Sequence, residues 1–435
     1  SSSVTSTTAC GGALSTGTRY WKVKTCDNSD LVGTYTATQT LTITATPTAP
    51  TSCTTSSITT SGTTVGWTDN ASSETGFQVE KSESGGAYAT ITTTAANAVS
   101  YAATSLSPNT QYTFRVAGVS GGGLSTYATC TAIYTLANVP SAPTVTAVSS
   151  SSINAVINEN SNPAATEFSI QIGSDYVQAN GTLGATQVWQ NKAAWGGSSG
   201  VAITGLSVNT AYSVTVIARN NPATVTSASS ATIKYTHVNT PTQTISAITS
   251  SQLAITIGEN SNPGSTVYAL KIGSNYVQAN GTVSASAIYQ TAAVWGTKTA
   301  TGVTASTTYT VQVIAKNGDE DITNGTSTAS TTYTLVDTPT QTLSNVATTS
   351  MSVSIGTATN PSTTQYSVKF NSSYVQANGT LAAEQIWQTN TTWTNLFSVT
   401  GLTASTSYTV QIIARNDNND TTNGSSSSTT TSTLL

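Results

Sequence analysis

The residues of this chain that could carry chemistry are few and scattered. Its only histidine, His237, lies where the sister segments have leucine, so we interpret it as a tolerated replacement. Carboxylates gather at residues 319–321 and around Asp417 and Asp420. A calcium site there would need several converging oxygen ligands, and we favour a solvated, variable loop. Because acid–base catalysis needs titratable groups held together, we predict no catalytic residue, no metal, no cofactor and no enzyme activity.

The composition excludes several classes of partner. Only 7% of the residues are charged and the net charge is −4. No stripe of Lys and Arg could neutralise phosphates, so we expect no nucleic-acid partner. No run of about 18 apolar residues predicts a transmembrane segment. No charged leader with an apolar core opens the chain, from which we expect a mature chain or a fragment.

The four cysteines lie in the first third of the chain, at Cys10, Cys26, Cys53 and Cys130. They have neither CxxC spacing nor a histidine partner, so we interpret them as disulfide candidates rather than metal ligands. Pairing Cys10 with Cys26 and Cys53 with Cys130 is one of three possible connectivities and the one that we adopt. Disulfides would place the protein in an oxidising compartment, either extracellular or on a cell surface.

The segment YVQANGT occurs three times, at intervals of 100 and 98 residues, which indicates tandem copies of one domain. Two more aromatic residues follow each copy in the same phase. These rings could stack on sugars or on a neighbouring subunit, but we favour a satellite core, because Trp is large and useful when buried. The aromatic sets are Tyr176, Trp189 and Trp195; Tyr276, Tyr289 and Trp295; and Tyr374, Trp387 and Trp393.

Apolar residues alternate with polar ones inside each unit, as in residues 153–157 and 168–172. A period of two is typical of strands with one buried face and favours antiparallel sheets packed in a sandwich. Short proline-bearing junctions such as NTPTQT at Asn239 separate the units. Proline restricts the backbone, so we expect a stiff succession of domains.

Each unit contains a Leu or Val that is followed six residues later by a Tyr. This spacing is typical of a tyrosine corner, in which the phenol bonds to the backbone of the preceding loop. The candidate corner residues are Tyr112, Tyr212, Tyr309 and Tyr408.

Residues 51–136 complete a family resemblance, with Trp67 on an expected strand, TDNASSETGFQVEKS after it and LSPNTQYTFRVAG carrying the corner. This stretch resembles a bacterial fibronectin type III domain of a surface protein, and the resemblance extends over nearly the whole chain. The later units have isoleucine in place of Trp67 and carry the YVQANGT insertion, so they form a divergent subgroup.

The resemblance implies an all-β fold of tandem fibronectin-type-III or Ig-like antiparallel β-sandwiches in an elongated rod. We expect one domain at residues 47–137 and repeats at 138–238, 239–337 and 338–435. Residues 1–46 look like the C-terminal half of another such domain. A half-domain exposes core and sheet edges. Either the polypeptide begins further upstream or another chain completes the half-domain by strand addition.

Each YVQANGT ends in an N-x-Thr sequon, and other sequons are scattered along the chain. Asn-Gly is also a turn signal, and we favour the turn over the glycan for the repeated set. The glycosylation candidates are Asn70, Asn180, Asn280, Asn324, Asn371, Asn378, Asn390, Asn419 and Asn423.

The function that these patterns favour is structural: a subunit of an extracellular or cell-surface fibre, filament or adhesin stalk. We expect it to assemble through β-sandwich contacts or strand addition, with copies of itself as partner and with surface glycans or other cells as further candidates. The alternative is a set of glycan-binding or spacer modules in a secreted carbohydrate-active protein, which predicts exposed rows of Trp. The fold itself hosts many roles.

Overall fold

The computed structural model of the chain describes residues 15–25, 33–221, 223–246, 248–394 and 396–435. Antiparallel strands dominate these residues, which confirms the predicted all-β class. The chain divides into two compact units. Unit 1 comprises Ser1–Thr144, Ala155–Val201 and Val214–Thr232, and unit 2 comprises Val145–Asn154, Ala202–Ser213 and Ile233–Leu435.

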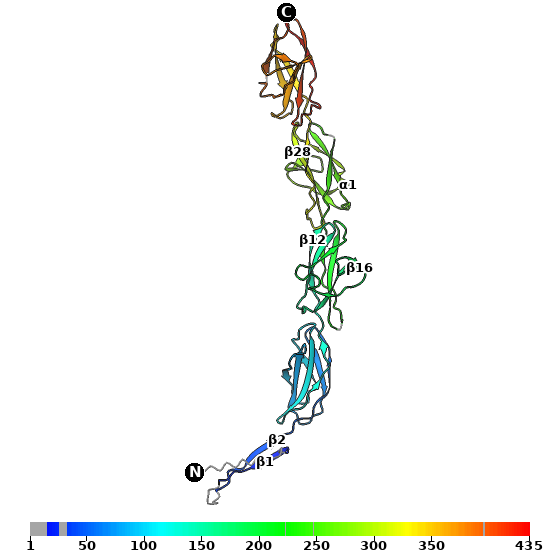
Figure 1. Cartoon of the computed structure of the whole chain (residues 1–435), viewed down its shortest axis with the longest axis vertical. Helices are drawn as coiled ribbons and strands as arrows, with labels where there is room; N and C mark the ends of the chain where they lie inside the picture. Colours follow the sequence, from blue (N-terminus) through cyan, green and yellow to red (C-terminus); the bar gives the residue numbers. More distant parts are fainter. Residues whose placement is uncertain (1–14, 26–32, 222, 247, 395) are drawn as a thin grey trace. The chain divides into compact units, whose positions relative to one another are not determined.

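Unit 1 begins with a two-stranded antiparallel ribbon of β1 (Gly17–Trp21) and β2 (Gln39–Ile43), in which Gly17 lies opposite Ile43 (Figure 1). Its side chains are almost all exposed, including Tyr20 at 72% and Trp21 at 53%. The described part of residues 1–46 therefore presents apolar rings to solvent.

The first complete sandwich of unit 1 has a three-stranded and a six-stranded sheet. Its core contains Trp67 and Phe77, whose ring centroids are 5.4 Å apart, together with Tyr112 and Phe114. The first sheet is β3 (Thr51–Ser56), β4 (Thr63–Thr68) and β7 (Ser100–Ala103). The second sheet is β5 (Gly76–Glu83), β6 (Ala89–Thr93), β8 (Gln111–Ser120), β9 (Gly123–Leu124), β10 (Ala128–Thr129) and β11 (Ile133–Tyr134).

The next repeat contributes strands to both units. One sheet has the order β12-β13-β18 and the other β16-β15-β14-β19-β20, with β17 paired to β14. The strands of the first sheet are β12 (Ser141–Ser149), β13 (Ser152–Asn158) and β18 (Val201–Thr204). Those of the second are β14 (Glu167–Ile172), β15 (Asp175–Val177), β16 (Leu183–Gly184), β17 (Gln190–Asn191), β19 (Ala211–Arg219) and β20 (Thr232–Tyr235).

Unit 2 contains two further sandwiches with the same sheet orders and separate buried cores. The first has β21 (Thr242–Ser246), β22 (Gln252–Gly258), β23 (Val267–Ile272), β24 (Asn275–Val277), β25 (Val283–Ser284), β26 (Gln290–Thr291), the short helix α1 (Ala292–Trp295), β27 (Thr297–Thr301), β28 (Thr308–Lys316) and β29 (Ser330–Tyr333). The second has β30 (Thr340–Ser344), β31 (Ser350–Gly356), β32 (Gln365–Phe370), β33 (Ser373–Val375), β34 (Leu381–Ala382), β35 (Gln388–Thr389), β36 (Leu396–Thr400), β37 (Ser407–Arg415) and β38 (Thr429–Ser432).

The cores follow from the alternation in the sequence. In β23, Tyr268, Leu270 and Ile272 are at most 3% exposed, and the matching residues of β32 are buried in the same way. The turn after β14 needs a left-handed backbone, which Gly173 supplies with a φ of 59°. In the equivalent turn after β32, Asn371 supplies it with a φ of 49°.

Candidate functional site

The most regular polar structure in the chain lies where one repeat meets the next. The last residues of β19, β28 and β37 are each followed by a buried asparagine, which is 3–4% exposed. Each asparagine Nδ2 donates over 3.1 Å to a backbone carbonyl of the preceding repeat. The donor and acceptor pairs are Asn220 with Thr135, Asn317 with Thr236, and Asn416 with Thr334. We call these the Thr135, Thr236 and Thr334 joints.

The asparagine oxygen fixes its own loop. Asn220 Oδ1 accepts from the Thr224 amide at 2.8 Å, and Asn317 Oδ1 accepts from the Asp321 amide at 2.9 Å. One side chain therefore orders the loop of its own repeat and binds the neighbouring repeat. Because both ends of the amide are bonded in a buried place, replacing it would leave buried backbone groups unpaired.

The acceptor threonine is also held on both sides. At the Thr236 joint, Thr236 Oγ1 donates to the Ser207 carbonyl at 2.7 Å and accepts from the Thr210 amide at 3.1 Å. Thr236 is completely buried. The carbonyl that receives the asparagine is thus presented by a fixed strand end.

A second contact crosses two of the joints. Asn109 Nδ2 donates to Thr166 Oγ1 at 2.9 Å in unit 1, and Asn209 Nδ2 donates to Thr266 Oγ1 at 2.8 Å in unit 2. Serine replaces this asparagine at the Thr334 joint. Ser306 Oγ and Thr364 Oγ1 are both buried there, and neither meets a hydrogen-bond partner among the described residues.

The linker is pinned to the repeat that follows it. In unit 1, Asn162 Oδ1 accepts from the Asn138 amide and Asn162 Nδ2 donates back to the Asn138 carbonyl, both at 2.8 Å. Asn262 and Asn360 make the same reciprocal pairs in unit 2. The linker is therefore part of the folded repeat rather than a free tether.

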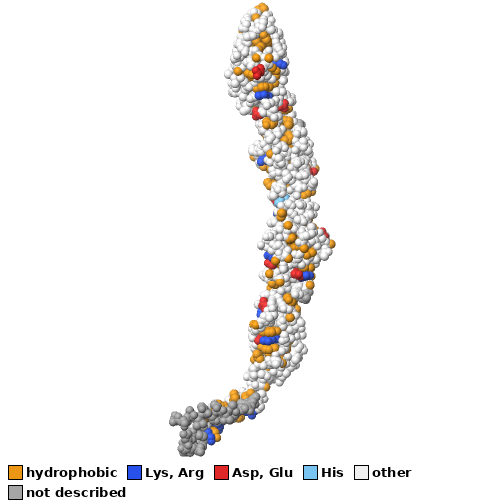
Figure 2. Space-filling view, in the orientation of Figure 1, with side chains coloured by type: hydrophobic (Ala, Val, Ile, Leu, Met, Phe, Trp, Pro, Cys, Tyr) orange, Lys and Arg blue, Asp and Glu red, His pale blue; other side chains and the backbone are white. Residues whose placement is uncertain are grey.

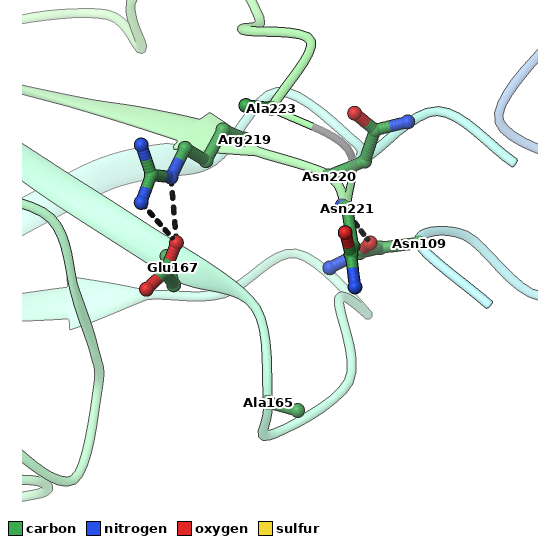
Figure 3. A pocket seen from close by; sticks show the side chains of 7 residues that line it. All are labelled: Asn109, Ala165, Glu167, Arg219, Asn220, Asn221 and Ala223. Carbon is green, nitrogen blue, oxygen red and sulfur yellow. Dashed lines mark hydrogen bonds and ion pairs between the residues drawn. The ribbon is translucent and has the colours of Figure 1, made fainter. Parts of the chain in front are cut away.

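A cavity of about 490 Å³ lies at the Thr135 joint (Figure 3). Glu167 and Arg219 point toward one another on one wall, with Arg219 Nε 2.6 Å from the carboxylate. On the other side, the Asn221 amide donates to Asn109 Oδ1 at 3.2 Å. The charges that line this cavity are thus already paired with each other.

Charged side chains elsewhere also occur close to opposite charges, as Figure 2 shows for one face. In the first sandwich, Glu80 is 2.7 Å from Arg115 Nε, and the guanidinium stacks on Tyr88 and Tyr127. Burial raises the pKa of the Glu80 carboxyl, but hydrogen bonds from Arg115, Tyr127 and Gln78 outweigh burial and lower that pKa overall.

The corner tyrosines lie at or near the start of their long strands, β8, β19, β28 and β37. Each phenol oxygen accepts from a backbone amide five residues earlier, at 2.8–2.9 Å. The pairs are Tyr112 with Ser107, Tyr212 with Ser207, Tyr309 with Thr304, and Tyr408 with Thr403.

The aromatic sets divide into buried and half-buried rings. Trp195, Trp295 and Trp393 are 2–3% exposed, and each indole donates to a backbone carbonyl of β14, β23 or β32. The second ring of each set is partly exposed. The Arg or Lys side chain that ends a neighbouring strand lies over this ring. These pairs are Trp189 with Arg219, Tyr289 with Lys316, and Trp387 with Arg415. Tyr176, Tyr276 and Tyr374 lie on β15, β24 and β33 and are partly exposed.

The repeated sequons lie in turns. Asn180, Asn280 and Asn378 are exposed, and each Oδ1 accepts from the amide and hydroxyl of the threonine two residues later. Asn70 Nδ2 instead donates to the Ala49 carbonyl. Asn324, Asn371, Asn419 and Asn423 have positive φ, and Asn390 follows β35.

Cys53 and Cys130 form a disulfide in the first sandwich. Cys10 and Cys26 lie outside the described residues. No three His, Cys, Asp or Glu side chains of the described ranges gather into a possible metal site. Within the same ranges, no helix is long and apolar enough to cross a membrane.

Residues 48–131 match the model of the fibronectin type III domain family. A two-domain fibronectin type III segment of chicken tenascin aligns over 44% of this chain and 100% of its own length, with 14% identity and a TM-score of 0.32. The FN1–FN3 domains of chicken CNTN1 align over 66% of this chain and 100% of their own length, with 14% identity and a TM-score of 0.25. No curated protein matches. Fibronectin type III repeats are generally structural or adhesion modules and are typically non-catalytic.

The sequence patterns did not point to the joint asparagines. Their signal is nevertheless present, because Asn follows Arg or Lys at the end of the same strand in three repeats. The prolines of the junctions indicated the linker, while the asparagines that bond across each joint lie more than 80 residues after their acceptors.

Proposed function

We propose that the chain is a structural subunit of an extracellular or cell-surface fibre, filament or adhesin stalk, in which the sandwiches are spacers. The observation that carries the proposal is the buried asparagine that bonds each repeat to the one before it. A hydrogen bond of this kind contributes about 0.5–1.5 kcal/mol, and breaking it leaves buried groups unpaired. Repeats joined in this way resist independent motion, which is what a spacer requires.

The Cys53–Cys130 disulfide supports an oxidising location, because disulfides persist mainly in extracellular compartments. The β1–β2 ribbon supports self-assembly. Among the described residues, Tyr20, Trp21 and Leu41 expose apolar surface on a ribbon of two strands, and such ribbon edges can pair with further backbone. A second copy of the chain that adds a strand to this ribbon is the partner that we propose.

Glycan binding is the weaker candidate. It requires exposed rows of Trp, whereas Trp195, Trp295 and Trp393 are buried and bonded to the backbone. We therefore propose that these three rings support the fold, and that the partly exposed Trp189, Tyr289 and Trp387 are covered by the cations that lie over them.

Electron microscopy of the purified native material tests the proposal. Continuous filaments are expected, and their loss in a Trp21→Ser variant would assign assembly to the ribbon. Ile233→Ser is the matched control, because Ile233 is a similarly exposed apolar residue on another strand, at 62%. Separate particles at every concentration would rule out self-assembly and leave the spacer role alone.

A further inference from the structure

The Thr236 joint carries opposite charges on its two sides. Lys234 lies near the end of β20, and His237 follows Thr236 just after that strand. The facing loop between β28 and β29 carries Asp319 and Asp321. Lys234 Nζ is 2.9 Å from Asp319 Oδ2, and His237 Nε2 is 3.3 Å from Asp321 Oδ2. Asp319 Oδ2 also accepts from the Tyr235 amide at 3.0 Å.

The Thr135 joint lacks these four charges, whereas the Thr334 joint keeps the counterpart of Asp321. This is Asp420, whose amide donates to Asn416 Oδ1 and whose carboxylate accepts from the Thr422 hydroxyl. The residues that correspond to Lys234 and His237 are Ile133 and Leu136 at the Thr135 joint, and Thr332 and Leu335 at the Thr334 joint. Asp321 thus has a counterpart in Asp420, where Leu335 stands at the place of His237, so the feature that distinguishes the Thr236 joint is a basic partner for this carboxylate.

Among the described residues, few other groups near the His237 imidazole could affect its charge. His237 is 8% exposed, its backbone bonds are to Ser149 and Asn209, and its Nδ1 is buried without a partner among the described residues. The charged groups around it are Asp321 and Asp319 from the loop and Lys234 from β20.

Glu320, the remaining charge of the loop, pairs at 2.9 Å with Lys316, the last residue of β28. The hydroxyl of Thr323 donates to the Asp321 carboxyl and is the main cause of its lowered pKa, and the charge of His237 lowers it further. Asp321 is therefore ionised wherever a histidine titrates.

We propose that the Thr236 joint is a proton-controlled latch. When His237 is protonated, the joint is held by two ion pairs, and when the imidazole is neutral only the Lys234–Asp319 pair remains fully charged. Histidine is the side chain that most readily loses its charge near neutral pH, so the latch loosens as the pH rises. A charge-assisted bond is stronger than a neutral one, while the buried, unpartnered Nδ1 of the protonated ring limits the gain. This property goes beyond a spacer role, since it makes the stiffness of one joint adjustable.

Amide hydrogen exchange on the full chain at low ionic strength tests the latch. The Gly318 amide donates across the Thr236 joint to Asn209 Oδ1 at 3.1 Å, so its protection reports opening of that joint. The Asn221 amide makes the same bond to Asn109 Oδ1 at the Thr135 joint, whose charged pair of Glu167 and Arg219 includes no histidine, and it is the internal control. After correction for intrinsic exchange rates, protection of Gly318 should fall roughly threefold from pH 5 to pH 8, as expected for one partly exposed ion pair, while that of Asn221 stays constant.

The variant His237→Leu should remove the change with pH, and it should fold because leucine occupies this place in both sister joints. Asp321→Asn should remove the change in the same way while keeping the histidine. Constant protection of Gly318 in the native chain would overturn the proposal. An equal fall at Asn221, or a fall that persists in both variants, would also overturn it.

Discussion

The unpaired hydroxyls at the Thr334 joint make a repair experiment possible. Ser306 occupies the place of Asn109 and Asn209, whose amides bond across their joints at 2.9 and 2.8 Å. The backbone is already suitable, because φ is 48° at Ser306 and 44° at Asn209. We predict that Ser306→Asn forms the missing bond to Thr364 Oγ1 and stabilises the chain.

The magnitude follows from two contributions. A new hydrogen bond to a buried hydroxyl that lacks a partner contributes about 1 kcal/mol. Asparagine also tolerates the left-handed region better than serine does, which adds a few tenths of a kcal/mol. The Tyr366 phenol lies close to the Thr364 hydroxyl, although the two make no hydrogen bond of good geometry. Because the phenol competes with a new asparagine for this hydroxyl, the gain in stability should lie near the lower end of the range for one hydrogen bond.

Thermal unfolding followed by calorimetry measures the effect. About 1 kcal/mol corresponds to a rise of about 4–8 °C in Tm for a domain of this size. The control is Ser405→Asn, because Ser405 occupies the place of Ser306 in the next repeat and has a φ of 51°, but no counterpart of Thr364 faces it among the described residues. If both variants raise the Tm equally, only the backbone preference has acted. If Ser306→Asn lowers the Tm, the alignment of the three joints is wrong.

Three more predictions concern the first sandwich. Tyr112→Phe should cost about 0.5–1.5 kcal/mol, because the Ser107 amide loses the acceptor of a part-buried hydrogen bond, and denaturant unfolding followed by Trp67 fluorescence will measure it. Reducing Cys53–Cys130, which closes a loop of 77 residues, should cost the same sandwich about 4 kcal/mol, so calorimetry with and without reductant should shift only one transition. Folding lowers the pKa of Glu80 below its usual 4.5, so its stabilising contribution is present above that value and is lost as the pH falls through the folded-state pKa. Unfolding measured from pH 6 to pH 2 should therefore show a smaller acid loss in Glu80→Gln than in the native chain.

The fold could be predicted from the sequence because its determinants are local. Residues 168–172 and 268–272 alternate in type, and the pleat of a strand turns alternation directly into a buried face. The spacing of Leu206 and Tyr212 is similarly local, since the corner bond spans only five residues. Such signals need no knowledge of which strands become neighbours.

The joints could not be predicted in the same way. Asn317 follows a strand and precedes a polar loop, a pattern that any turn would give, and its acceptor at Thr236 lies 81 residues earlier. His237 and Asp321 are equally far apart in the sequence, so neither residue type indicates the other. Only the register between successive repeats brings these side chains together.

The choice of residue at the joints fits a chain with few charges. An asparagine amide bonds to a carbonyl at any pH and is barely weakened by salt, whereas a surface ion pair is screened and contributes little. Joints built on Asn220 and Asn416 should therefore stay closed under changing conditions. Adding Lys234, His237 and Asp319 to one joint of the same design leaves its asparagine bond in place and adds a response to protons and salt. If stiffness were the only requirement, the leucine of the sister joints would serve equally well at position 237, which is why the exchange experiment on His237→Leu separates a spacer from a spacer with one adjustable joint.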